Sequence, residues 1–246
     1  MICNLCPRKC NAQRSESSGG GFCRMGTNPV IARVAPHFGE EPCISGANGS
    51  GTIFFSGCTL GCVYCQNYEI SSLHKGREVT PQQLADCYKR LEEQNVHNIN
   101  LVTADHFAPA VVKSFEIYKP KIPIVYNCSG YTSPKILNML DGIVDIYLPD
   151  FKYSNNELAL KYSLAPNYVE TATVAIKEML FQVGFPQFDD RQMMQKGIIV
   201  RHLILPSHTK NSMEVLDILK KTMAIRFLSA LWGSISPWAT LINMKK

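Results

Sequence analysis

Short apolar runs alternate with amphipathic stretches along the chain from about residue 51 to residue 222. Five of these runs have the length and residue types of β-strands. They are Thr52–Ser56, Asn98–Thr103, Ile122–Asn127, Ile143–Leu148 and Gly197–Leu205. Because strands that alternate with helices form βαβ units, this order predicts an α/β fold with a parallel sheet.

The first helix between these strands has a complete start signal. Thr80 suits the N-cap, Pro81 suits the first helical position, and Gln83 can close a capping box with Thr80. Apolar residues then recur at helical spacing, at Leu84, Cys87, Tyr88 and Leu91. We therefore expect Cys87 to pack in the core.

Further helices are predicted by the same spacing near Ala108–Tyr118, Thr171–Val183 and Ser212–Thr222. The connection from Phe151 to Lys196 is long for one βα unit, and we expect it to contain an additional helix. A sixth strand is expected within Ala224–Trp232, although the composition changes from about residue 223 onward and the end of the chain is atypical.

Residues 1–50 have a different character. They are rich in turn residues, with a polar loop at Ser15–Gly21, and they show no apolar periodicity. The pattern predicts that something other than a hydrophobic core holds this segment. We therefore expect two parts, a cysteine-rich metal-binding segment at 1–50 and a barrel at 51–246.

Composition excludes several classes of protein. With 46% hydrophobic and 18% charged residues, the chain is neither disordered nor collagen-like. The net charge of +5 is too diffuse to indicate a nucleic-acid partner. The N-terminus has no apolar run typical of a signal peptide, and the uncharged stretch Phe227–Asn243 is short and contains Gly233 and Pro237. We expect a cytoplasmic protein without a membrane partner.

Three of the ten cysteines lie directly after the first predicted strand. Cys58, Cys62 and Cys65 have the spacing C-x3-C-x2-C. Active sites of parallel α/β folds form at the carboxyl ends of strands, where this loop lies. Three thiolates can hold a [4Fe–4S] cluster and leave its fourth iron open. A structural zinc site usually has four protein ligands, and this spacing offers no local fourth.

A second group of cysteines lies near the N-terminus. Cys3, Cys6, Cys10 and Cys23 provide four soft ligands within 21 residues. In a reducing compartment such a group indicates a metal site, here a closed tetrahedral one that stabilises structure. Zinc and a second iron–sulfur cluster both accept four thiolates. Cys43 is an alternative ligand, and free surface thiols are the other interpretation.

The motif C-x3-C-x-aromatic-C after a first strand resembles the radical S-adenosylmethionine (SAM) superfamily. Over about residues 1–220 the chain further resembles the uncharacterised iron–sulfur homologues of pyruvate formate-lyase activating enzyme. The runs that carry this resemblance are Cys3-Asn-Leu-Cys-Pro-Arg-Lys-Cys, Glu41-Pro-Cys-Ile-Ser-Gly, Cys62-Val-Tyr-Cys-Gln-Asn, Asn98-Ile-Asn-Leu-Val-Thr, Asp145-Ile-Tyr-Leu-Pro-Asp-Phe-Lys and Arg201-His-Leu-Ile-Leu-Pro.

The resemblance implies a partial (β/α)6 barrel, a TIM-like fold, with a [4Fe–4S] cluster and SAM as cofactors. One electron, from a donor such as flavodoxin or ferredoxin, would cleave SAM to a 5′-deoxyadenosyl radical. That radical would then abstract a hydrogen atom from a substrate. The protein would place the cofactors and exclude water.

The resemblance also implies which residues hold SAM. Tyr64 is the aromatic residue of the motif, and Asn127 stands where the activating enzymes have the Asp of an Asp-x-x-Gly turn. Asp150 and Lys152 match an Asp-x-Lys pattern, in which the lysine can pair with the methionyl carboxylate. Arg201 and His202 occupy the place of a cationic ligand contact on the fifth strand.

One motif of the activating enzymes is missing. They have Gly-Gly-Glu after the second strand, where this chain has Val102-Thr-Ala-Asp-His106. Asp105 is the candidate carboxylate for the SAM ammonium, on chemical grounds alone. His106 is equally well explained as an ordinary turn residue, and the motifs assign no catalytic residue.

Three functions remain open at the level of sequence. The first is a radical SAM enzyme that acts on an unknown substrate. The second is a glycyl-radical activase, whose substrate is a backbone glycine of another protein. The third is a non-catalytic iron–sulfur or zinc protein. An open coordination position distinguishes the two enzymes from the third class, because an electron carrier would close its cluster with a fourth cysteine.

Overall fold

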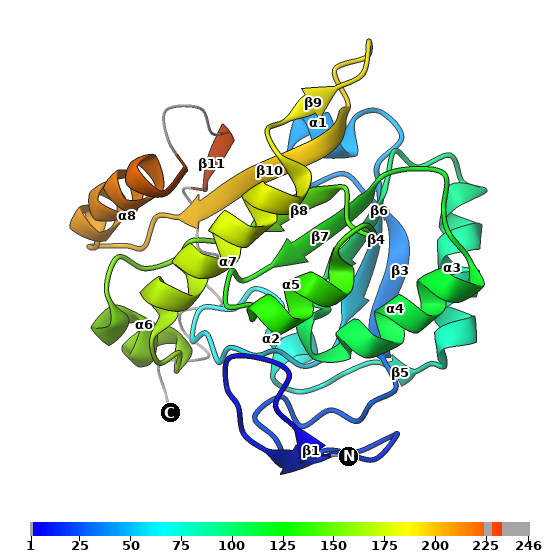
Figure 1. Cartoon of the computed structure of the whole chain (residues 1–246), viewed down its shortest axis with the longest axis horizontal. Helices are drawn as coiled ribbons and strands as arrows, with labels where there is room; N and C mark the ends of the chain where they lie inside the picture. Colours follow the sequence, from blue (N-terminus) through cyan, green and yellow to red (C-terminus); the bar gives the residue numbers. More distant parts are fainter. Residues whose placement is uncertain (1, 224–227, 233–246) are drawn as a thin grey trace.

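The computed structural model describes residues 2–223 and 228–232, and its centre is a curved, mainly parallel β-sheet (Figure 1). Within these residues the sheet has nine strands, and six of them run parallel in the order β4-β6-β7-β8-β10-β11. Their bounds are Ser50–Phe55 for β4, Ile99–Val102 for β6, Ile124–Cys128 for β7, Ile146–Pro149 for β8, Met194–Leu203 for β10 and Leu228–Trp232 for β11.

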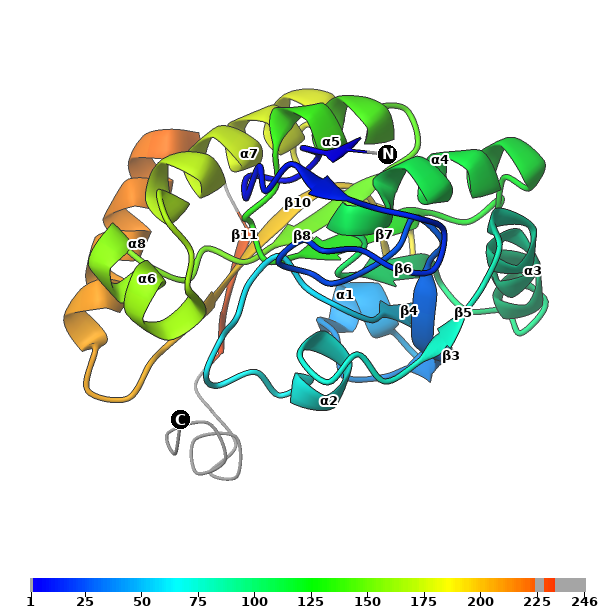
Figure 2. The same cartoon turned by 90° about the horizontal axis from the view of Figure 1, so that it is seen from below.

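Helices between consecutive strands cover the outer face of this sheet (Figure 2). They are α3 (Pro81–Glu92), α4 (Ala108–Ile117), α5 (Pro134–Leu140), α7 (Tyr168–Val183) and α8 (Thr209–Met223). This alternation of parallel strands and helices confirms the predicted α/β fold of a partial TIM-like barrel. The additional helix expected after the fourth predicted strand is α6 (Asn156–Ser163).

The local signals in the sequence are confirmed where they were strongest. Thr80 caps α3, accepting a hydrogen bond from Gln83 N, while Gln83 Oε1 accepts one from Thr80 N. Cys87 is buried in the core, as its place on the helical stripe predicted.

The sixth predicted strand is β11, which pairs in parallel register with β10. Residues 224–227 and 233–246, including most of the uncharged stretch, lie outside the described residues.

The expectation that residues 1–50 lack a hydrophobic core is wrong. Strand β3 (Val30–His37) pairs antiparallel with β4 and adds to the central sheet, and β5 (Arg77–Glu78) pairs with its outer side. The prediction missed β3 because this half-exposed strand includes Arg33 and Pro36 and so has no clean alternation. The residues of this segment that join the main core are Cys3, Leu5, Cys6, Met25 and Ile31. The division at residue 50 stays a prediction.

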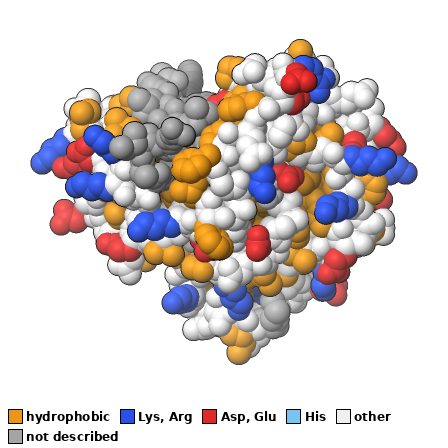
Figure 3. All heavy atoms as spheres, turned by 45° about the horizontal axis from the view of Figure 1, so that its top comes forward, with side chains coloured by type: hydrophobic (Ala, Val, Ile, Leu, Met, Phe, Trp, Pro, Cys, Tyr) orange, Lys and Arg blue, Asp and Glu red, His pale blue; other side chains and the backbone are white. Residues whose placement is uncertain are grey.

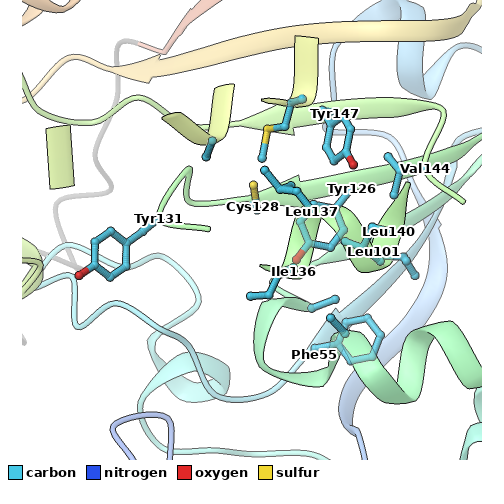
Figure 4. Packing of buried hydrophobic residues seen from close by; sticks show 14 of the residues in the cluster. Phe55, Leu101, Tyr126, Cys128, Tyr131, Ile136, Leu137, Leu140, Val144 and Tyr147 are labelled. Atoms are coloured by element: carbon cyan, nitrogen blue, oxygen red, sulfur yellow. The ribbon is translucent and has the colours of Figure 1, made fainter. Parts of the chain in front are cut away.

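Alternation along the strands separates two buried layers. Tyr126 and Tyr147 face the helices and pack near Leu137 and Leu140 of α5 (Figure 4). Their neighbours on the other face form a smaller apolar cluster around α1 (Pro42–Ser45). That cluster consists of Ile44, Val125, Ile146, Leu148, Met194 and Ile199. Helix α1 therefore fills the interior at the amino ends of the parallel strands.

The charged side chains on the surface agree with the diffuse net charge of the sequence. On the face shown in Figure 3, acidic and basic side chains are interspersed. Among the helices within the described residues, none is both long enough and apolar enough to cross a membrane.

Candidate functional site

The candidate residues gather at the carboxyl ends of the parallel strands, because those ends share one edge of the sheet. The loop after β4 carries Cys58, Cys62 and Cys65 and passes to the short helix α2 (Tyr68–Ser71). The loops after β7 and β8 begin with Ser129 and with Asp150, respectively. The end of β10 brings Arg201 next to Asp150 in an isolated parallel bridge.

Each cysteine sulfur of this loop takes part in a hydrogen bond. The backbone N–H of Leu60 donates to Cys58 Sγ at 3.3 Å, and Ser163 Oγ donates to Cys62 Sγ at 2.8 Å. Cys65 Sγ and Ser71 Oγ are 3.2 Å apart. Hydrogen bonds to ligand sulfurs orient them and tune the redox potential of an iron–sulfur cluster.

Ser163 links Cys62 to a pair of buried tyrosines. The Tyr64 and Tyr153 hydroxyls are 2.6 Å apart, and the Tyr153 hydroxyl also bonds Ser163 Oγ. The predicted SAM contact Tyr64 is thus packed with its hydroxyl in this chain of hydrogen bonds. The sequence did not mark Ser163 or Tyr153 as site residues. Ser163 ends α6 and Tyr153 precedes that helix, so both are about 100 residues away from the cysteine motif.

Without a metal, burial favours the protonated thiols of Cys58 and Cys62. Burial raises the pKa of Cys62 to about 11, although the nearby Lys152 ammonium acts in the opposite direction. Burial and the neighbouring Cys62 also raise the pKa of Cys58 above its usual range. Because metal ligands must be thiolates, metal binding here releases protons and supplies the charge that these buried sulfurs lack.

Asp150 and Lys152 lie at the end of β8 as predicted, and they pair with each other. Lys152 Nζ is 2.5 Å from Asp150 Oδ2. Burial alone would lower the pKa of Lys152, but Asp150 and Cys62 raise it above its usual value, so the ammonium stays charged. The cation thus lies close to both the cysteine loop and a carboxylate, where it can meet an anionic ligand.

The turn after β7 packs tightly against this pair. Gly130 has a φ of +73°, and a Cβ built on it would lie 2.1 Å from the carbonyl oxygen of Asp150. The Tyr168 hydroxyl lies 2.9 Å from the Ser129 carbonyl oxygen and also accepts a hydrogen bond from Lys152 N. Glycine at position 130 therefore sets the distance between the loops after β7 and β8.

Arg201 faces the barrel interior, but its surroundings differ from the expected cationic contact. Arg201 Nε donates to Glu41 Oε1 at 2.8 Å, and Nη2 bonds Glu40. Glu40 Oε1 also accepts from Asn100 at 3.0 Å and from Asn127 at 3.4 Å. The predicted Asn127 and Arg201 are thus brought together through Glu40. Glu40 and Asn100 were not predicted as site residues, although an acidic pair precedes Pro42 in the sequence.

His202 lies on the opposite face of β10, because neighbouring residues of a strand point in opposite directions. Its Nδ1 is 2.7 Å from the Phe151 carbonyl oxygen, and its Nε2 is 2.9 Å from Ser212 Oγ of α8. Both ring nitrogens are engaged under the helices, and burial lowers the pKa of the ring. His202 therefore lies near Asp150 and Lys152 but on the helix side of the sheet, and we leave it out of the proposed site.

Asp105 follows β6 and is buried. Thr132 Oγ1 donates to its Oδ1 at 2.5 Å. Burial raises the pKa of Asp105 to about 6, while the Thr132 hydroxyl acts against that shift. Its charge contributes to the raised pKa of Cys58 and of Cys6. Asp105 therefore lies close enough to both cysteine groups to act on their charge, which the sequence did not predict.

Comparison with known proteins identifies the domain that carries this site. The family model of the Radical SAM superfamily matches residues 52–219. The chain belongs to this superfamily. A [4Fe–4S] cluster and SAM are therefore its cofactors. The predicted resemblance to the superfamily is confirmed, whereas the resemblance to the activating-enzyme homologues stays a prediction.

One curated relative and two solved structures are similar to this chain. The chain is 28% identical over 232 residues to the uncharacterized protein MJ0674 of Methanocaldococcus jannaschii, covering 90% of this chain and 62% of that protein. It thus spans about three fifths of the length of this relative. The SAM-bound structure of Streptococcus suis SuiB has a TM-score of 0.50 at 9% identity, over 75% of this chain and 40% of that one.

A second solved structure, TYW1 with a lysine–pyruvate adduct bound, also has a TM-score of 0.50. Its sequence identity is 8%, and the match covers 75% of this chain and 65% of that one. At such low identity, both structures support the fold of this radical SAM domain and carry no information about its substrate.

The residues present fit an iron–sulfur cluster in the chemistry of their donors. Cys58, Cys62 and Cys65 are soft ligands from one loop, and each sulfur already has a hydrogen-bond partner. Among the described residues, no group of three or more His, Cys, Asp or Glu side chains is arranged to hold a metal ion.

Replacing Gly130 tests whether the contact between the two loops positions Asp150. We expect Gly130→Ala to lower the free energy of unfolding clearly more than Gly142→Ala and to weaken SAM binding at least about tenfold. Gly142 is the matched control, because its φ is +74° and a Cβ there has no described atom within 4 Å. Backbone strain alone costs about 1 kcal/mol. Denaturant titration and SAM titration measure the effects, and equal losses in the two variants would contradict the prediction.

The raised pKa of Asp105 predicts a dependence of stability on pH. The carboxyl has a pKa of about 6 in the folded chain and an ordinary value of 3.8. The folded state thus binds the proton more tightly, and stability falls as pH rises from about 4 to 6. The loss is up to about 3 kcal/mol. We expect Asp105→Asn to remove this part of the pH dependence in denaturation experiments, and parallel curves for the two proteins would contradict it.

Proposed function

We propose that this chain cleaves SAM reductively at a cluster held by Cys58, Cys62 and Cys65, and that it abstracts a hydrogen atom from a substrate. The observation that carries the proposal is the loop after β4, whose three thiols are hydrogen-bonded and lie at the carboxyl edge of the sheet. When bound, the cluster and SAM supply the electron transfer, the carbon–sulfur cleavage and the radical that abstracts hydrogen.

The side chains around the loop have distinct roles in this proposal. Lys152 offers its ammonium to the carboxylate of SAM, and Asp150 keeps the lysine charged and oriented. Ser163 holds Cys62 through its hydrogen bond, and Tyr64 and Tyr153 exclude water from that side of the loop. Gly130 keeps the turn after β7 close enough to position Asp150.

The polar residues in the interior of the barrel favour a substrate with a polar group. Arg201, Glu40 and Asn127 form a buried polar floor beneath the carboxyl ends of the strands. Asn100 Oδ1 is a buried acceptor without a hydrogen-bond partner among the described residues. A polar group that reaches this floor can satisfy the acceptor, whereas an apolar group would leave it unpaired.

The alternatives from the sequence have unequal support. Members of the radical SAM superfamily are enzymes, which argues against a non-catalytic iron–sulfur or zinc protein. The glycyl-radical activase rests on sequence motifs alone and stays a prediction. An electron donor such as flavodoxin or ferredoxin and a cytoplasmic location belong to the proposal as well.

The proposed reaction has a direct chemical test. The anaerobically purified protein, once reduced with dithionite, is expected to convert SAM to methionine and 5′-deoxyadenosine, which chromatography measures. Cys58→Ala should lose most of its iron and this activity, because two thiols cannot hold the cluster. Cys87→Ala is the control, since Cys87 is buried in the core away from the loop. Full iron retention in Cys58→Ala, or no cleavage by cluster-replete protein, would refute the proposal.

The hydrogen bond from Ser163 to Cys62 predicts a shift in redox potential. Donors to a ligand sulfur stabilise the reduced, more negative cluster. We expect Ser163→Ala to lower the midpoint potential of the cluster, and Ser163→Thr to restore it at least in part. Potentiometric titration followed by electron paramagnetic resonance measures the shift. An unchanged potential in the alanine variant would show that this contact does not tune the cluster.

A further inference from the structure

The N-terminal cysteines come together in the folded chain. Cys3, Cys6, Cys10 and Cys23 line one small cavity of about 10 Å³, with Arg14 and His106 also on its wall, and Cys10 is exposed at its edge. Cys3 ends strand β1 (Ile2–Cys3), which pairs antiparallel with β2 (Ala12–Gln13). Cys6 and Cys10 lie in the loop between these strands, and Cys23 lies in the loop after β2. We call this space the N-terminal cysteine cavity.

Burial raises the pKa of Cys6 to about 11 and also raises the pKa of Cys23, and backbone donors around the cavity oppose this shift. The amide of Arg8 hydrogen-bonds Cys6, and the amide of Met25 hydrogen-bonds Cys23, so each sulfur meets the N–H two residues further along. Lys9 and Arg24 follow these cysteines with φ values of +44° and +54°. Such turns direct backbone donors at a sulfur, and donors stabilise the charged form.

Cationic side chains provide further compensation for negative charge. Arg14 is buried and donates through Nη1 to Cys3 Sγ at 3.5 Å. Its charge also favours the thiolate of Cys23. Four thiolates around a divalent ion carry a net charge of about −2, which is costly to bury unless cations lie close by. The arginines of this segment thus match the charge of a tetrathiolate centre.

We propose that Cys3, Cys6, Cys10 and Cys23 bind one Zn²⁺ in a closed structural site. The small size of the cavity favours a single ion over an iron–sulfur cluster, both of which accept four thiolates. A space of about 10 Å³ is near the size of one water molecule. A single ion fits it, with Zn–S bonds of about 2.3 Å, whereas a [4Fe–4S] cubane would have to push the two loops apart.

The sulfurs have to converge when the ion binds. No group of three or more His, Cys, Asp or Glu side chains in the described part of the chain is already arranged to hold a metal ion. The same holds for Cys58, Cys62 and Cys65 of the radical SAM motif, so this does not distinguish the two groups. Cys43, the alternative ligand, lies in α1 against the interior cluster and does not line the cavity.

The position of the cavity indicates what the ion would stabilise. The N-terminal segment lies against the loop after β4 (Figures 1 and 2). Arg8 Nε donates to the Thr59 carbonyl oxygen at 2.7 Å, and a Cβ on Gly57 would lie 2.6 Å from Met25 Cγ. Ser133 Oγ donates to the Leu5 carbonyl oxygen at 2.6 Å. The ion would therefore fix the segment that covers the backbone beside Cys58.

Metal analysis of the full chain tests the site independently of the radical chemistry. In a variant with Cys58, Cys62 and Cys65 replaced by alanine, we expect about one equivalent of zinc per chain and no iron. Adding Cys6→Ser or Cys23→Ser should lower the zinc content at least about fivefold, because three thiolates bind Zn²⁺ less tightly. Adding Cys43→Ser is the matched control and should leave the zinc content unchanged.

X-ray absorption at the zinc edge of the otherwise unmodified chain provides a second measurement if the triple variant does not fold. It should show four sulfur neighbours at about 2.3 Å. Iron with sulfide in the triple variant, zinc that persists without Cys6 and Cys23, or no metal in either preparation would overturn the proposal. None of these outcomes depends on SAM cleavage, so they leave the proposed function to its own test.

Discussion

Hydrogen bonding between the parallel strands holds their carboxyl ends at one edge of the sheet, and the candidate site depends on that constraint. The loops after β4, β7 and β8 bring Cys62, Ser129 and Lys152 together although long helical connections separate them in sequence. Without the common edge, the ammonium of Lys152 would not lie near the sulfur of Cys62. The tight contact of Gly130 with Asp150 shows how little space the shared edge leaves between neighbouring loops.

The alternation of side chains along each strand separates packing from chemistry. On β10, Arg201 faces the interior and meets two carboxylates, while His202 faces α8 and is held by Phe151 and Ser212. The apolar layer under the helices supports the sheet, and the polar side chains inside the barrel form the floor that we propose to meet the substrate. Burying Arg201 with Glu40 and Glu41 contributes little net stability, because desolvation opposes their attraction. These ion pairs instead fix the geometry of that floor.

Sequence reasoning predicted the features that are encoded locally. The capping box of Thr80, the parallel strands and the spacing of Cys58, Cys62 and Cys65 are properties of short segments, and they identified the fold and the superfamily. Contacts between distant segments could not be predicted in this way. Ser163 meets Cys62 only because α6 folds over the cysteine loop, and Glu40 meets Arg201 only because α1 enters the barrel. Strand β3 was not predicted, because its half-exposed face includes Arg33 and so breaks the apolar pattern.

The anchoring of Arg8 has a consequence for the order of assembly during synthesis. Arg8 hydrogen-bonds the Leu164 carbonyl oxygen, a residue 156 positions further along the chain. A ribosome adds roughly 5–20 residues per second, so the N-terminal thiols wait on the order of ten seconds for this partner. During that interval the first 25 residues cannot pack against the finished barrel. Zinc binding at the proposed N-terminal site would thus have time to precede docking, and the metal-bound segment would then reach the barrel as a unit.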